Sequence, residues 1–303
     1  MAGGDGFRSL EYLVSMRRHL HWLGSAVAVI GVIFVALKLR EYGGQLDLAR
    51  LDGADWIGIA GLALAYGLAS ALLGLAWREL LAGLSVDVSA IWALKAHGIS
   101  QIGKYLPGNV FHFAARQAMG MADGAPALAL AKSALWELAS LAATAATFGW
   151  LLLPLAVPAF PAWAAASLML LTLAGGTYLG RRHVGAPMAR AIWIYALFLA
   201  ISGAMFVCLL VLVSRGGIGA ASFIPVAGAY VIAWLAGLIT PGAPSGLGIR
   251  EMVLVLLLGT LVHEADLLLA VLLGRLVTVA GDVVLLLGAL ALPGAAPRPV
   301  APP

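Results

Sequence analysis

The feature that most constrains this chain is a series of apolar stretches, each roughly 20 residues long, that recur along the sequence. An α-helix needs about 20 residues to cross the hydrocarbon core of a bilayer, which is about 30 Å thick. Hydrophobic residues make up 62% of the chain and charged residues 11%. The runs are continuous and rich in Leu, Ala and Gly, whereas a transmembrane β-barrel would show short alternating segments. The sequence therefore predicts an all-α, polytopic integral membrane protein.

Apolar length and flanking charges predict about six transmembrane helices. The first run is too long for the apolar core of a signal peptide, so we expect it to be retained as a helix. Residues 1–19 then form a cytoplasmic N-terminal segment, residues 20–290 a single membrane domain and residues 291–303 a flexible C-terminal tail. The expected spans are at about 20–39, 56–76, 127–153, 161–180, 190–213 and 266–290.

Two further segments do not fit the pattern of simple spans. Residues 89–121 are amphipathic and are broken at Pro107-Gly108, while residues 223–262 are apolar but are interrupted between Thr240 and Gly248. Each apolar piece of the second segment has about 17 residues, which is marginal for a full crossing. We expect both segments to be re-entrant helical hairpins, with two short spans as the alternative for the second.

The distribution of basic residues agrees with cytoplasmic N- and C-termini. With both hairpins returning to the side they entered from, eleven basic residues fall on the cytoplasmic side: Arg8, Arg17, Arg18, Arg78, Lys95, Lys104, Arg116, Arg181, Arg182, Arg190 and Arg298. Four fall outside: Lys38, Arg40, Arg50 and Arg215. Two short spans in place of the second hairpin would hardly change this count.

The two breaks are similar in sequence. In "KYLPGNVFHFAAR" and in "LITPGAPSGLGIR", a Pro-Gly pair precedes an arginine that lies nine residues after the proline. The hairpins would enter from opposite faces, as in transporters built from inverted repeats with broken helices near the midplane. Non-helical backbone at that depth requires cover from protein or water, so we expect one shared polar cavity. The residues expected at the hairpin tips are Pro107, Gly108, Pro241, Gly242 and Pro244.

The chemistry of the second break favours an anionic ligand. A helix that restarts after "APSGLG" presents unpaired N–H groups and the positive end of its dipole, with Ser245 as a candidate N-cap. Arg250 adds a permanent forked donor that suits phosphate. We therefore expect a phosphate-bearing ligand. The expected substrate-binding residues are Lys104, Arg116, Ser245, Gly246, Gly248, Arg250 and Glu251.

Charged residues at membrane depth are expensive and suggest either function or pairing. Glu251 has three interpretations: it neutralises Arg250, it pairs with an arginine of another helix such as Arg275, or it binds an amino group of a zwitterionic ligand. Glu137 is either the partner of Lys132 or Arg275 or a proton-coupling carboxylate. The residues assigned to coupling or intramembrane pairing are Lys132, Glu137, Arg275 and Asp282.

The two broken regions, "GKYLPGNVFHFAAR" and "TPGAPSGLGIREMVL", resemble the signature regions of a flippase-like membrane family. That family includes the transmembrane region of lysylphosphatidylglycerol synthases and their stand-alone prokaryotic relatives. Lys104, Pro107 and Gly108 match its Lys-x-x-Pro-Gly element. A Pro-x-Gly-x-Gly-x-x-Glu element is matched by Pro244, Gly246, Gly248 and Glu251, with Ser245 where a further glycine is commoner. The resemblance covers about residues 20–290 and implies a lipid-moving domain in a prokaryotic cell (inner) membrane.

Neither a catalytic signature nor a cluster with metal-ligand spacing is present, so we expect no enzyme activity, no metal and no cofactor. The basic residues lie beside membrane spans, which favours a topology signal over nucleic-acid binding. The predicted function is the movement of a phospholipid or polyprenyl-linked lipid between leaflets. The alternative is a non-transporting accessory or enzyme subunit that binds a lipid-linked sugar in a cell-envelope glycolipid pathway. Homodimerisation and association with envelope lipid-modifying enzymes both stay open.

Overall fold

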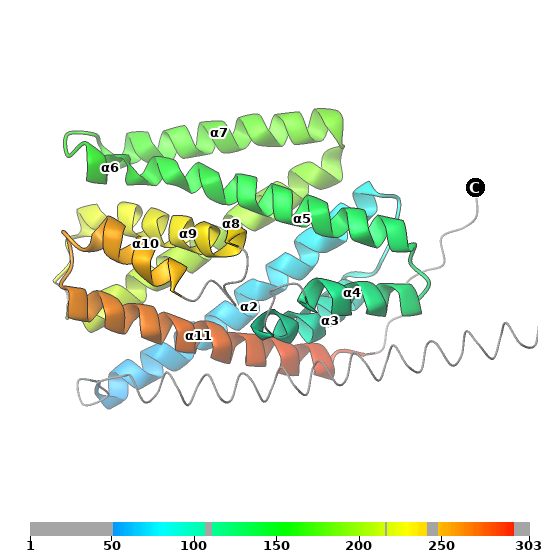
Figure 1. The fold of residues 1–303 in the computed structure, drawn as a ribbon, viewed down its shortest axis with the longest axis horizontal. Helices are drawn as coiled ribbons and strands as arrows, with labels where there is room; N and C mark the ends of the chain where they lie inside the picture. The colour runs from blue at the N-terminus through cyan, green and yellow to red at the C-terminus, as the bar shows by residue number, and fades with distance from the viewer. Residues whose placement is uncertain (1–50, 107–110, 216, 241–247, 294–303) are drawn as a thin grey trace, which may run out of the picture.

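The computed structural model describes residues 51–106, 111–215, 217–240 and 248–293. Within these residues the regular elements are all helical, and most helices run along the long axis of the molecule (Figure 1). The helices are α2 (Gly53–Gly83), α3 (Ala90–Gln101), α4 (Phe111–Ala122), α5 (Ala127–Thr147), α6 (Leu153–Ala156), α7 (Ala162–His183), α8 (Ala186–Val213), α9 (Phe223–Ile239), α10 (Ile249–Leu258) and α11 (Glu264–Ala291). Short 3₁₀ turns are η2 (Ile102–Tyr105), η3 (Phe148–Leu152) and η4 (Ala220–Ser222).

Six helical stretches in the described part of the chain are long and apolar enough to cross a membrane, which indicates a multi-pass membrane protein. Five of them correspond to predicted spans: Gly53–Gly83, Ala127–Ala156, Ala162–His183, Ala186–Val213 and Glu264–Ala291. The sixth, Ala220–Ile239, is the first half of the second broken segment, which the sequence had assigned to a hairpin. The predicted span at 20–39, the N-terminal segment 1–19 and most of the C-terminal tail lie outside the described residues.

Local signals explain where the helices begin. Asp52 and Asp55 form a reciprocal capping box at the start of α2, in which each carboxylate accepts from the other residue's backbone N–H at 2.9 Å. The bond from the Asp55 N–H holds the pKa of Asp52 below its usual range. Prolines stand at the start of α5, α7 and α8, where the missing N–H costs no helical hydrogen bond.

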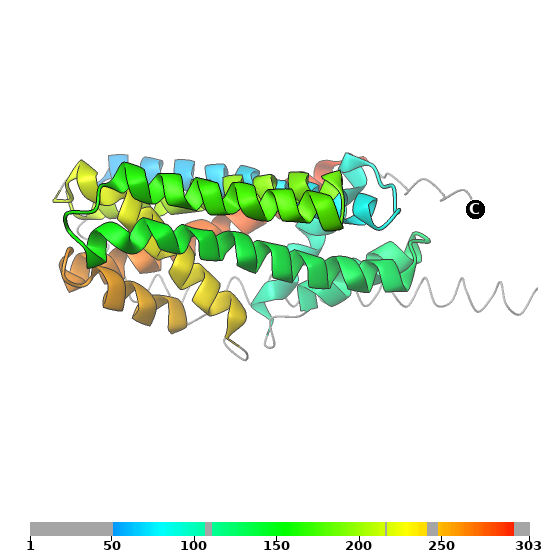
Figure 2. The same cartoon turned by 90° about the horizontal axis from the view of Figure 1, so that it is seen from above.

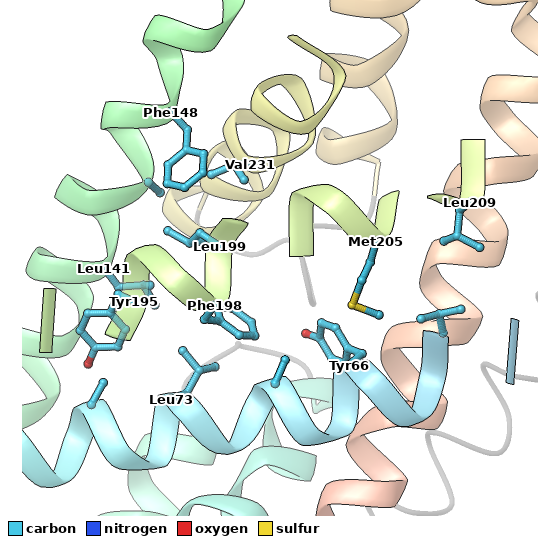
Figure 3. Close-up of a cluster of buried hydrophobic side chains, with 14 of the residues drawn as sticks. Tyr66, Leu73, Leu141, Phe148, Tyr195, Phe198, Leu199, Met205, Leu209 and Val231 are labelled. Atoms are coloured by element: carbon cyan, nitrogen blue, oxygen red, sulfur yellow. The ribbon is translucent and has the colours of Figure 1, made fainter. Parts of the chain in front are cut away.

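The centre of the molecule is built on α2, which packs against both α8 and α11. Aromatic and aliphatic side chains from α2, α5, α8 and α9 fill this region (Figure 3). At the α2–α11 crossing, a Cβ added to Gly67 would lie 2.6 Å from the backbone oxygen of Gly281. A Cβ on Gly281 would lie 2.9 Å from the backbone nitrogen of Gly67. Small residues therefore bring the two backbones into direct contact, as is common between membrane helices.

The outer surface is apolar where α7 covers the bundle. Trp163 is 73% exposed and Leu171 68% exposed, and Tyr178 and Leu179 are also exposed. An apolar face of this extent would be a liability in water but suits contact with lipid tails.

The two broken segments lie at opposite ends of the long axis. The α3–α4 pair lies at the end where α2 finishes, and the α9–α10 pair at the end where α11 begins (Figures 1 and 2). Both α4 and α10 are short, with 12 and 10 residues, which correspond to about 18 and 15 Å of helix. Each segment therefore consists of two helices on either side of a break that falls outside the described residues.

Candidate functional site

Most of the buried ionisable side chains in the described residues fall into two groups, each of which includes a residue of the first broken segment; Asp55, which pairs with Arg215 at the start of α2, lies apart from both. Isolated charges are costly inside a membrane protein. The partners of each charged side chain therefore indicate whether it has a structural role or has an unbalanced charge and unused hydrogen-bonding atoms that a ligand could bind. We call the first group the Arg116 cluster: His97, Arg116 and Glu137, with Trp77. We call the second the α11 cluster: Lys104, Arg250, Glu251, Arg275 and Asp282.

The Arg116 cluster ties α3, α4 and α5 together. The Arg116 guanidinium forms a two-pronged ion pair with the Glu137 carboxylate, in which one prong, Nη1 to Oε1, measures 3.3 Å. The same Nη1 lies 3.1 Å from Nδ1 of His97. Because arginine only donates, this His97 nitrogen must be the acceptor, which puts the ring hydrogen on Nε2. Arg116 and Glu137 are 3% and 5% exposed, so the pair is sealed from solvent.

Aromatic rings complete the surroundings of Arg116. Its guanidinium carbon lies 4.4 Å from the Trp77 ring centroid and 5.4 Å from that of Phe113, both within cation–π range. The Trp77 Nε1–H donates to Ser133 Oγ at 3.0 Å, which fixes the ring on α2 against α5. The arginine is thus neutralised by a carboxylate and enclosed by rings.

In the α11 cluster, the first broken segment binds to Asp282, which is fully buried. Lys104 Nζ lies 2.7 Å from Asp282 Oδ2, and the Tyr105 hydroxyl donates to the same oxygen. Both donors come from η2, the 3₁₀ turn that ends α3. The other carboxylate oxygen, Oδ1, is buried and has no hydrogen-bond partner.

The second broken segment binds to Arg275, seven residues earlier on α11. Nε and Nη2 of Arg275 both donate to Glu251 Oε1, at 3.1 and 2.9 Å. The other oxygen, Oε2, is buried without a partner. Since seven residues are about two helical turns, Arg275 and Asp282 share one face of α11, roughly 10 Å apart. Residues next to both breaks therefore converge on one face of one helix.

Arg250 lies beside this ion pair, and none of the carboxylates in the described residues forms an ion pair with it. Its guanidinium carbon is 5.8 Å from the Trp234 ring centroid, and its Nε is buried without a hydrogen-bond partner. It interacts electrostatically with Arg275 and Glu251. The α11 cluster holds three cations and two carboxylates, a net charge of +1 with neutral tyrosines. The two carboxylates bind Lys104 and Arg275, so Arg250 carries the charge that is not balanced.

The start of α10 explains how Arg250 and Glu251 reach this position. Gly248 precedes the helix with φ +82°, a left-handed conformation that a residue with a side chain adopts only under strain. It occupies the N-cap position, so the assignment of Ser245 as N-cap is wrong. Arg250 and Glu251 then lie in the first turn of α10, directly after the break.

The structure places the other predicted site residues as follows. Lys132 is exposed on α5. Glu137 binds Arg116, so neither Lys132 nor Arg275 is its partner as we had expected. Arg116 and Arg250, expected to hold one phosphate together, lie in different clusters: Arg116 binds Glu137, and Arg250 lies beside the Glu251–Arg275 pair. The tip residues Pro107, Gly108, Pro241, Gly242, Pro244, Ser245 and Gly246 lie outside the described residues.

Tyrosines are the part of the site that sequence reasoning missed. Tyr105 donates to Asp282, and Tyr66 of α2 interacts electrostatically with Asp282, Arg250 and Tyr230. The one available signal was that Tyr105 directly follows the matched lysine of the first motif; nothing in the sequence marked Tyr66 or Tyr230. No group of three or more metal-ligating side chains occurs in the part of the chain that the structure describes.

Comparisons with known proteins found no matching family model, curated protein or solved structure.

Proposed function

We propose that this protein is a membrane transporter that moves a phosphate-bearing lipid between leaflets, with the headgroup bound at the α11 cluster. The observation that carries the proposal is that residues beside both breaks meet on one face of α11, where Arg250 has no anionic partner among the described residues. A phosphate monoanion at Arg250 would bring the cluster to neutrality. The forked guanidinium suits a phosphate better than a single-point cation would.

The placement of the broken segments supports alternating access. Their helix pairs lie at opposite ends of the long axis, and α10 covers only about half of a 30 Å hydrocarbon core. In this proposal both segments are re-entrant hairpins related by inverted symmetry, and rocking of the halves around the site opens it to each leaflet in turn. The flippase-like family suggested by the two motifs belongs to the same proposal.

The charges at the two ends of the bundle support an orientation. At the end where α2 finishes, basic residues gather on α2, α3, α7 and α8, whereas Arg215 is the basic residue described near the opposite end, where Asp52 and Asp55 flank it. Those at the first end are Arg78, Lys95, Arg181, Arg182 and Arg190. In the proposed topology this end faces the cytoplasm of a prokaryotic cell, with both termini on that side.

A reconstitution experiment tests the proposal. The purified chain is inserted into phosphatidylcholine vesicles with a trace of acyl-labelled phosphatidylglycerol, and the outer-leaflet label is followed with a membrane-impermeant quencher. We expect the protein to accelerate exchange, Arg250→Ala to slow it by at least about tenfold, and Lys132→Ala, which removes an exposed cation on α5, to leave it unchanged.

Other outcomes separate the alternatives. Exchange that Arg250→Ala leaves intact would rule out this site. Binding of the label without exchange would favour the accessory role, in which a lipid-linked sugar is held but not moved, and a chemically altered lipid recovered from the vesicles would favour an enzyme subunit.

A further inference from the structure

The α11 cluster contains two carboxylate oxygens that its own cations do not use. Glu251 Oε2 and Asp282 Oδ1 are both buried and both lack a hydrogen-bond partner, while the second oxygen of each carboxylate carries two donors. A carboxylate oxygen can only accept, so each open position requires a donor from a ligand or from water. Together with Arg250 Nε, an open donor, they define which headgroup complements the site.

We infer that the headgroup is a phosphate diester, with one negative charge, that also carries free hydroxyl groups, a polyol or sugar phosphate, rather than a zwitterionic amine. The inference rests on the proposed function and specifies its substrate class. The phosphate pairs with Arg250, and the hydroxyls donate to Glu251 Oε2 and Asp282 Oδ1.

The charge of the cluster decides between hydroxyl and ammonium donors. Three cations and two carboxylates give +1, so a headgroup with one negative charge and neutral hydroxyls brings the buried site to zero. A zwitterionic headgroup adds no net charge and leaves the site at +1. A buried uncompensated charge is costly, because little water is present to solvate it.

The hydrogen-bond requirement decides against simpler anionic headgroups. A phosphatidic acid is a phosphate monoester: as a dianion it has no O–H donor and takes the cluster to −1, and as a monoanion its single P–OH satisfies at most one of the two carboxylate oxygens. A choline headgroup has neither a net negative charge nor an N–H or O–H donor. A glycerol or sugar phosphate has both the charge and the donors, so Glu251 acts as a specificity-determining residue.

Access to these atoms requires movement. Both oxygens are shut off from solvent in the described structure, and Asp282 is fully buried. Lys104 and Glu251, which bind to α11 from the two broken segments, keep 17% and 25% of their side chains exposed. The ligand therefore reaches the cluster from the side of the broken segments, as these separate from α11.

The test ranks four acyl-labelled lipids in phosphatidylcholine vesicles that contain the unaltered protein: phosphatidylglycerol, phosphatidic acid, phosphatidylethanolamine and phosphatidylcholine. We expect exchange of phosphatidylglycerol to exceed that of phosphatidylethanolamine and phosphatidylcholine by about tenfold or more and that of phosphatidic acid severalfold. Equal exchange of all four would overturn the inference but leave lipid movement intact. Absence of any exchange would overturn the proposed function itself.

A variant isolates the role of Glu251. Glu251→Gln keeps an acceptor for Arg275 but replaces the open oxygen with an amide that donates. We expect the preference for phosphatidylglycerol over phosphatidic acid to fall to about one, with phosphatidic acid exchanged at least as fast as before. Lys132→Gln, which removes an exposed charge, should leave the ranking unchanged. Retention of the preference in a folded Glu251→Gln protein would overturn the inference, and the ranking by the unaltered protein tests it even if the variant does not fold.

Discussion

The Arg116 cluster and the α11 cluster differ in how completely their charges are matched. In the first, one guanidinium meets one carboxylate through two prongs, with a histidine and aromatic rings around it. In the second, Arg250 has no carboxylate of its own and two carboxylate oxygens have no donor. In the Arg116 cluster the ion pair is complete and the buried atom without a partner is Nε2 of His97, whereas in the α11 cluster the open atoms belong to the charged groups themselves.

This difference distinguishes charged side chains that stabilise the fold from charged side chains that are available to bind a ligand. A buried ion pair whose donors and acceptors are all used joins helices, and a ligand would gain no further hydrogen bond or ion pair from it. A cluster with open donors and acceptors is unfavourable by itself and becomes favourable only when a complementary molecule binds. Depth in the membrane alone does not distinguish the two cases; what does is whether the charged groups themselves have unmatched atoms.

The largest effect should come from breaking the saturated pair. Glu137→Ala leaves the sealed guanidinium of Arg116 without its anion, and we expect a loss of about 3–5 kcal/mol in unfolding free energy. Thermal unfolding in detergent, followed by circular dichroism, measures the loss. The double variant Arg116→Met with Glu137→Leu should lose much less, because it removes both charges. Equal losses in the two proteins would show that the packing of these residues matters more than their charges.

An intermediate effect is expected in the α11 cluster at Lys104. Lys104→Gln removes the cation that faces the fully buried Asp282, but Tyr105 still donates to that carboxylate. Since Lys104 is partly exposed, we expect a loss of about 1–3 kcal/mol, smaller than at Glu137. The same unfolding assay checks this, with Lys132→Gln as the matched control. A loss as large as that of Glu137→Ala would mean that the α11 cluster is as tightly closed as the Arg116 cluster.

Arg250→Ala should separate function from stability. Because Arg250 has no carboxylate of its own, its removal should change unfolding free energy by no more than about 1 kcal/mol while lipid exchange falls at least about tenfold. Unfolding and exchange are measured on the same preparation. A variant that loses stability in proportion to exchange would place Arg250 with the structural charges, beside Arg116.

The smallest effect is expected at an exposed ion pair at the end of the bundle. Arg190 Nη2 lies 2.6 Å from Glu79 Oε2, and the arginine side chain is 56% exposed. Arg190→Gln should cost less than about 1 kcal/mol, and the cost should shrink further in high salt. Unfolding at low and high ionic strength measures both. A salt-independent loss of several kcal/mol would show that this end is buried in an interface.

The spans could be predicted because their signal is local. Apolar length marks α5, α7, α8 and α11 to within a few residues, whereas the predicted span at 56–76 ends seven residues before α2 does at Gly83. The second broken segment could not be classified by that rule. Its first half, with η4, is 20 residues long and qualifies as a span by length, while its second half does not.

The members of the site could be predicted better than their partners. Charges in apolar surroundings identified Arg250, Glu251, Arg275 and Asp282, and the Glu251–Arg275 pair was among the alternatives considered. The pairing of Glu137 with Arg116 was not, because it depends on how α4 folds back against α5. Tertiary contacts of this kind produce no recognisable spacing of residues in the sequence. A tyrosine that donates to a buried carboxylate cannot be told from any other tyrosine in the sequence.

The glycine contact between α2 and α11 has a mechanical consequence. The backbones of α2 and α11 touch at Gly67 and Gly281, so at this crossing no side chains lie between the two helices to slide or repack. We therefore expect α2 and α11 to form a spine that moves as a single body. Since α11 carries Arg275 and Asp282, the site itself belongs to this spine, and any motion that opens it must be made by the short helices docked onto it.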